Sequence, residues 1–184
     1  MSRNTTAKYS GLAMLLHWGI GALVIAQWLI SEAAEDAPSK AEQGAIMANH
    51  FSLGAVIFVL VAVRLIWRQV SPPPASLNHS PWERTLAKVV HYTFYALLLV
   101  MPMAGWVAMS SFGEGVGVFG LFTLPPLPVG VDPARGEAIF ELHGTAGIAL
   151  LVLIAFHALA ALKHQFVDKD GTLFRMLPFG TVRD

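Results

Sequence analysis

The chain has 184 residues, of which 55% are hydrophobic and 13% are charged, and its mean hydropathy is +0.58. A soluble domain carries about 25% charged residues, so this composition excludes an ordinary globular protein. Cysteine is absent, which excludes disulfides, thiolate nucleophiles, iron–sulfur clusters and cysteine–zinc sites.

Four apolar runs follow one another along the chain, at residues 12–31, 46–67, 86–109 and 139–162. Each reaches the roughly 20 residues that a helix needs to cross a bilayer. The first run is too long for the apolar region of a signal peptide and lacks a small-residue cleavage site, so we expect it to remain as a helix. These runs predict an all-α fold, a four-helix transmembrane bundle in which residues 1–184 form one integral membrane domain. We expect lipid to surround it and no nucleic acid to bind it.

The connections between the runs differ in charge. Lys40 and Arg135 are the two basic residues of the first and third connections, and the other ten lysines and arginines fall at the termini or around the second connection. The acidic residues of the first and third connections are Glu32, Glu35, Asp36, Glu42, Glu114, Asp132, Glu137 and Glu141. Because basic residues collect on the cytoplasmic side, both termini are predicted to be cytoplasmic.

The third connection, residues 112–136, is long and rich in glycine, proline and apolar residues. Its residual hydrophobicity predicts a cap that lies on the outer membrane surface, and a disordered loop is the alternative.

Four histidines lie inside the apolar runs at matching depths. His17 is about five residues into the first run on the cytoplasmic side, whereas His50 and His143 are about five residues into the second and fourth runs on the outer side. His157 follows His143 by fourteen residues, close to four helical turns, so the two lie on nearly one face and about 21 Å apart along the axis. Depth therefore gives an outer pair, His50 with His143, and an inner pair, His17 with His157.

Haem iron explains this arrangement well. Neutral imidazole is a common axial ligand, and haem is held by side chains from facing helices in bundle cores. A single intramembrane histidine could instead bond a neighbouring helix, but four at two matched depths favour two haem groups. Zinc or copper held by two histidines would lack the usual third ligand.

A third histidine shares the inner depth. His91, near the start of the run 86–109, is level with His17 and His157, so depth alone leaves open which two of the three bind iron. His91 otherwise becomes a candidate contact for a haem propionate or a quinone. Arg64, fourteen residues after His50, reaches the same level, where it could pair with a propionate or extend to the lipid phosphates.

His164 and Lys163 follow the fourth run at the cytoplasmic surface. Together they make a candidate proton-exchanging quinone site, and a solvated helix end is the alternative. His79, in the proline-rich linker after the second run, is predicted to be exposed.

Several stretches together resemble the bacterial cytochrome b561 family, the short four-helix type of the inner membrane. The resemblance covers most of the chain and rests on Leu16-His17-Trp18, Asn49-His50-Phe51-Ser52-Leu53-Gly54, Val63-Arg64-Leu65, His91-Tyr92-Thr93-Phe94-Tyr95, His143-Gly144, the stretch from His157 to His164, and the tail from Lys169 to Pro178.

The resemblance implies two b-type haems, the inner one on His17 and His157 and the outer one on His50 and His143. It thus selects His157 over His91. It also implies electron transfer between an external partner and the membrane ubiquinone pool, with superoxide as a candidate donor and a quinone-linked, superoxide oxidase-like activity. The acidic outer connections depart from the positive surface that would attract superoxide.

Two other functions compete with this one. The chain could be a haem-bearing anchor subunit of a separate dehydrogenase or hydrogenase, or a haem-free metal-binding or transport bundle. The apolar middles of the second and third runs offer little sign of a transport path.

Overall fold

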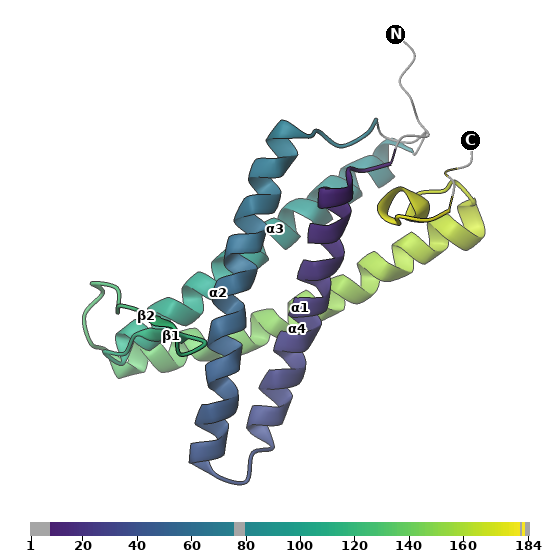
Figure 1. Cartoon of the computed structure of the whole chain (residues 1–184). Helices are drawn as coiled ribbons and strands as arrows, with labels where there is room; N and C mark the ends of the chain where they lie inside the picture. The colour runs from purple at the N-terminus through teal and green to yellow at the C-terminus, as the bar shows by residue number, and fades with distance from the viewer. Residues whose placement is uncertain (1–7, 76–79, 181, 183–184) are drawn as a thin grey trace.

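The computed structural model describes residues 8–75, 80–180 and 182, and its main elements are four long helices. In chain order they are α1 (Gly11–Glu35), α2 (Lys40–Val70), α3 (Pro81–Ser111) and α4 (Pro133–Lys163) (Figure 1). All four are long and apolar enough to cross a membrane. The predicted all-α transmembrane fold is therefore confirmed, although His79 lies outside the described residues.

The helices begin earlier than the apolar runs because polar side chains cap them. Ser39 accepts a hydrogen bond from the Glu42 amide at the start of α2, and Asp132 accepts one from the Arg135 amide at the start of α4. Such caps satisfy amide groups that have no partner within the helix. Two helices also open with proline, which suits the first helical position.

The helices pair in chain order. α1 packs most extensively on α2, and α3 on α4, and the two pairs cross one another (Figure 1). The buried core lies where they cross and consists of Leu16, Ile20 and Val24 of α1, Ile57 and Val61 of α2, and Leu150 of α4. Many large apolar side chains point outward instead, among them Leu15 at 69% exposure and Leu142 at 70%. An apolar exterior of this kind suits lipid.

The connection between α3 and α4 is a folded cap. Strands β1 (Val116–Val118) and β2 (Phe122–Leu124) form an antiparallel hairpin, whose turn contains Phe119 at φ 48° and Gly120 at φ 69°. The hairpin packs on α2, where the buried Ser52 hydroxyl accepts a 2.8 Å hydrogen bond from the Phe119 amide. A cap was expected, but its two strands were not predicted.

The C-terminal tail folds back onto the start of α1. It contains a π-helix, η1 (His164–Asp168), and a 3-10 helix, η2 (Leu173–Met176). The Trp18 indole donates to the Met176 carbonyl at 2.7 Å, and the buried Arg175 side chain donates to the Ala75 carbonyl at 2.8 Å. The start of α1 and the described part of the C-terminal tail therefore lie at the same end of the bundle (Figure 1).

Candidate functional site

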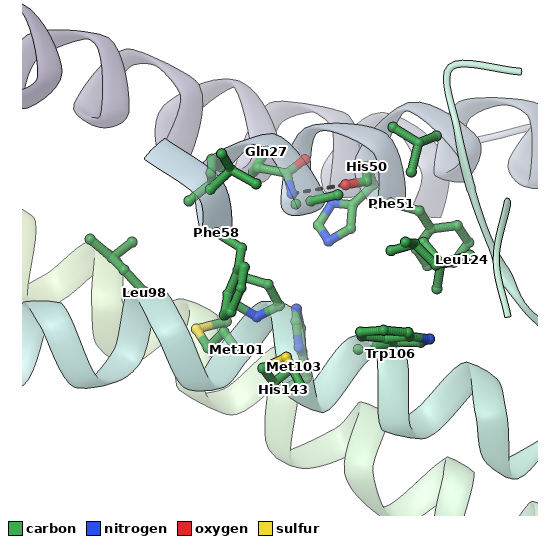
Figure 2. A pocket seen from close by; sticks show the side chains of 18 of the residues that line it. Gln27, His50, Phe51, Phe58, Leu98, Met101, Met103, Trp106, Leu124 and His143 are labelled. Carbon is green, nitrogen blue, oxygen red and sulfur yellow. Dashed lines mark hydrogen bonds between the residues drawn. The ribbon is translucent and has the colours of Figure 1, made fainter. Parts of the chain in front are cut away.

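The outer histidine pair faces across the bundle. His50 on α2 and His143 on α4 have ring centroids 6.1 Å apart, with their planes inclined by 63°. Figure 2 shows both side chains at one cavity, His50 entering from α2 and His143 from the opposite wall. The structure thus brings together the two residues that depth paired.

The cavity around this pair holds about 380 Å³, within the range of small-molecule sites. Its walls are mainly apolar and include Leu98, Met101 and Trp106 (Figure 2), and residues of the β1–β2 hairpin also line it. Gly105 leaves room beside His143, since a Cβ there would lie 3.8 Å from the imidazole Cε1. An apolar wall of this kind suits a flat hydrophobic cofactor.

Three buried polar atoms at this cavity make no hydrogen bond with the described residues. They are His50 Nδ1, His143 Nδ1 and Gln27 Oε1. The main-chain carbonyls of Gln27 and Met101 lie near the His50 and His143 rings respectively, without a hydrogen bond to Nδ1 that meets full geometry. Because Nδ1 of each ring is buried, Nε2 is the nitrogen left to act as a ligand.

The inner histidines form a group of three rather than a pair. The His157 ring on α4 has its centroid 6.0 Å from that of His17 on α1 and 5.8 Å from that of His91 on α3. Phe94 also lies against His157, at 5.4 Å. The predicted partners His17 and His157 do meet, but His91 meets the same ring, so the structure leaves the choice between them open.

These separations suit two imidazoles that share one metal ion. A metal–nitrogen bond of about 2.0 Å, with the ring centre about 1 Å behind the nitrogen, places two such centroids about 6 Å apart. The outer separation of 6.1 Å and the inner one of 6.0 Å both agree. Together with the unpaired Nδ1 atoms and the apolar cavity, they show that the residues present fit a haem held by two histidines.

Arg64 lies beside the inner group. Its Nη1 donates to the Ala13 carbonyl of α1 at 2.8 Å, and its charge acts on both His17 and His91. Arg64 therefore lies at the depth of the inner histidines, as its spacing from His50 predicted. Its contact with a haem propionate stays a prediction.

Lys163 and His164 belong to a network with carboxylates. Lys163 Nζ contacts Glu83 at 3.1 Å and Asp168 at 2.8 Å, and His164 Nδ1 lies 2.7 Å from Asp170 Oδ2. Burial opposes ionisation of Asp170, but hydrogen bonds from Thr172 and His164 hold its pKa below the ordinary value. Lys163 and His164 were predicted from the sequence but these carboxylates were not, although the spacing of Asp168 from Lys163 and His164 could have indicated them.

Gln27 is a residue of the outer cavity that was not predicted from the sequence. Its Nε2 donates a 2.9 Å hydrogen bond to the His50 carbonyl, and its side chain lines the outer cavity (Figure 2). The one feature of the sequence that could have indicated this residue is a polar amide side chain near the outer end of the first apolar run.

Four apolar helices that gather histidines at two levels define a membrane protein of the cytochrome type. The family model of prokaryotic cytochrome b561 matches residues 8–179, and the chain belongs to that family. Family membership makes it a multi-pass bacterial membrane cytochrome of electron transfer and implies b-type haem.

Curated relatives agree with this assignment over nearly their whole length. The chain is 35% identical to "Probable superoxide oxidase CybB" of Yersinia pestis, over 93% of this chain and 96% of that protein. It is 30% identical to "Cytochrome b561 homolog 2" of Escherichia coli, over 95% of this chain and 93% of that protein. It is 29% identical to "Cytochrome b562" of Cereibacter sphaeroides, over 92% of this chain and 94% of that protein.

Proposed function

We propose that the protein is a di-haem b-type cytochrome of the bacterial inner membrane, transferring electrons between an external partner and the ubiquinone pool. One observation carries the proposal: α4 presents His143 and His157 at two levels, and each faces a histidine of another helix at about 6 Å. His50 and His143 would hold the outer haem, and His17 and His157 the inner one. Bound haem supplies one-electron redox chemistry.

The protein's own residues adapt the sites to electron transfer. A histidine pair would hold each haem from both sides, and the haem would then supply electron transfer rather than binding of a small molecule at the metal. The apolar lining of the outer cavity excludes water and lowers the local dielectric, which also influences the potential. Along α4 the two levels are about 21 Å apart, so that one helix connects the two sides of the membrane.

Quinone chemistry belongs at the cytoplasmic end in this proposal, near His91, Arg64, Lys163 and His164. Reduction of a quinone takes up protons as well as electrons. His164 Nδ1 and Asp170 Oδ2, 2.7 Å apart, form a pair able to exchange a proton with the cytoplasm. Arg64 is the candidate partner for an inner propionate.

The external partner follows from the topology. The charge distribution places both termini in the cytoplasm, so the outer haem would face the external reactant. The Yersinia pestis relative is named a probable superoxide oxidase, which supports superoxide as a donor and an oxidoreductase activity. The acidic outer loops act against the approach of an anion.

Haem stoichiometry tests the proposal. The purified protein should contain two b-type haems per chain by the pyridine haemochrome method and show a sharp α-band on reduction. His143→Ala should lose the outer haem and keep the inner one, giving one haem per chain. Retention of both haems by this variant would show that the pairing is wrong.

The same purification separates the rival functions. A haem-free metal-binding or transport bundle predicts no Soret absorbance after expression with ample haem. An anchor subunit predicts a stoichiometric dehydrogenase or hydrogenase partner that copurifies from native membranes.

A further inference from the structure

Gln27 connects α1 to the main chain of an outer histidine. Its Nε2 donates to the His50 carbonyl at 2.9 Å, and both residues line the same cavity (Figure 2). Gly54, one turn after His50, leaves room for the amide, because a Cβ there would lie 3.4 Å from Nε2. The amide is thus fixed at the base of the His50 side chain.

Gln27 and His50 each contain one polar atom that lacks a hydrogen-bond partner in the part of the chain that the structure describes: an acceptor on Gln27 and a nitrogen able to donate on His50. Gln27 Oε1 and His50 Nδ1 are both buried and make no hydrogen bond with the described residues, although the Gln27 main-chain carbonyl lies near the His50 ring. A histidine that binds iron through Nε2 carries its proton on Nδ1, and this proton is normally given to an acceptor. One buried acceptor and one buried donor, on side chains that are already neighbours, are complementary.

We propose that Gln27 is a positioning residue for the outer haem. When haem is bound, its side-chain carbonyl accepts the Nδ1–H of His50 while its amide group keeps α1 joined to α2. The inference rests on the proposed function, since it requires a haem on His50 and His143. An acceptor at Nδ1 makes the imidazole a stronger donor to iron, which stabilises the ferric state and lowers the midpoint potential.

Two substitutions separate the acceptor from the link between helices. Gln27→Met keeps the length of the side chain but removes both polar groups, whereas Gln27→Glu removes the amide donor and supplies a stronger acceptor. Either change leaves the Gln27 main-chain carbonyl in place. The acceptor role predicts shifts of opposite sign: the outer midpoint potential rises in Gln27→Met and falls in Gln27→Glu, while the inner potential stays unchanged.

A matched control is available in Gln43. Its Nε2 donates to the Ala34 carbonyl at 3.2 Å, which makes the same kind of amide link between α2 and α1 away from the histidines. Gln43→Met should therefore leave both potentials unchanged. Potentiometric titration gives the midpoints, and low-temperature electron paramagnetic resonance should show altered g-values for the outer haem alone in the two Gln27 variants.

Each outcome decides one question. Fewer than two haems in the unmodified protein would refute the proposed function itself. Two haems with unmoved outer potentials, or shifts of the same sign in both Gln27 variants, would overturn the role of Gln27 alone. Loss of the outer haem from both variants would also overturn it, because a contact that only tunes the iron is not required for binding.

Discussion

At the scale of single residues, the inner histidine group leaves open whether His17 or His91 is the second ligand beside His157. His157 meets both His17 and His91, at 6.0 and 5.8 Å. Both separations suit two iron–nitrogen bonds, and the family resemblance assigns His17. We predict that His17→Ala lowers the haem content from two to one per chain, whereas His91→Ala retains two.

The haem content of both variants is measured by the pyridine haemochrome method. The midpoint potential of the outer haem, which neither substitution should change, serves as an internal reference. A change in the inner potential of His91→Ala is compatible with a contact to a propionate. The reverse pattern, with loss of haem only from His91→Ala, would make His91 the axial ligand.

Matched depth along apolar runs predicted the meeting of His50 with His143 and of His17 with His157, because helix rise converts residue number directly into height. Residue number does not give the rotation of a helix about its axis or the way in which helices pack. The contact between His91 and His157 depends on both, so depth could not predict it. Gln27 was missed for a different reason: its chemistry is not that of a metal ligand, and its observed link to the site is a hydrogen bond to the His50 carbonyl.

At the scale of secondary-structure elements, the hairpin depends on one buried hydroxyl. Ser52 accepts from the Phe119 amide at 2.8 Å and donates to the Ala48 carbonyl at 2.8 Å. We predict that Ser52→Ala destabilises the protein by about 1–3 kcal/mol, because the Phe119 amide loses its acceptor. The hairpin turn should also become more sensitive to protease.

Thermal unfolding in detergent and limited proteolysis measure the two effects. Thr85→Ala is the control, since this exposed hydroxyl makes an intrahelical bond to the Pro81 carbonyl at 3.0 Å. Equal losses in the two variants would show that Ser52 acts as an ordinary helix residue and does not hold the cap.

Hydropathy predicted the existence of all four helices, since a run of about 20 apolar residues has few alternatives in a membrane. It could not predict where they begin, because the first turns of α2 and α4 are polar and depend on the caps at Ser39 and Asp132. The β1–β2 hairpin escaped prediction because its strands have three residues each, too short for a periodic pattern.

At the scale of the whole molecule, the two ends of the bundle differ in charge although the net charge is zero. The first and third connections carry eight acidic residues and two basic ones. Arg135 has its charge partly neutralised by Asp132 at 3.9 Å and donates to the Ser111 hydroxyl, so it offers little attraction to an incoming anion. The molecule therefore has an acidic end, which the proposed topology places outside, and a basic end, which it places inside.

This asymmetry predicts how electron exchange at the outer face responds to salt. In right-side-out vesicles, oxidation of the reduced outer haem by the anion ferricyanide should accelerate as salt rises, because screening weakens repulsion beyond about 10 Å at 0.1 M. Oxidation by the cation hexaammineruthenium(III) should slow over the same range. Stopped-flow absorbance of the outer haem gives both rates. Neutralising the exposed Glu32, Glu35 and Asp36 to their amides should flatten both slopes, and identical salt slopes for the two oxidants would show that the acidic face does not govern approach.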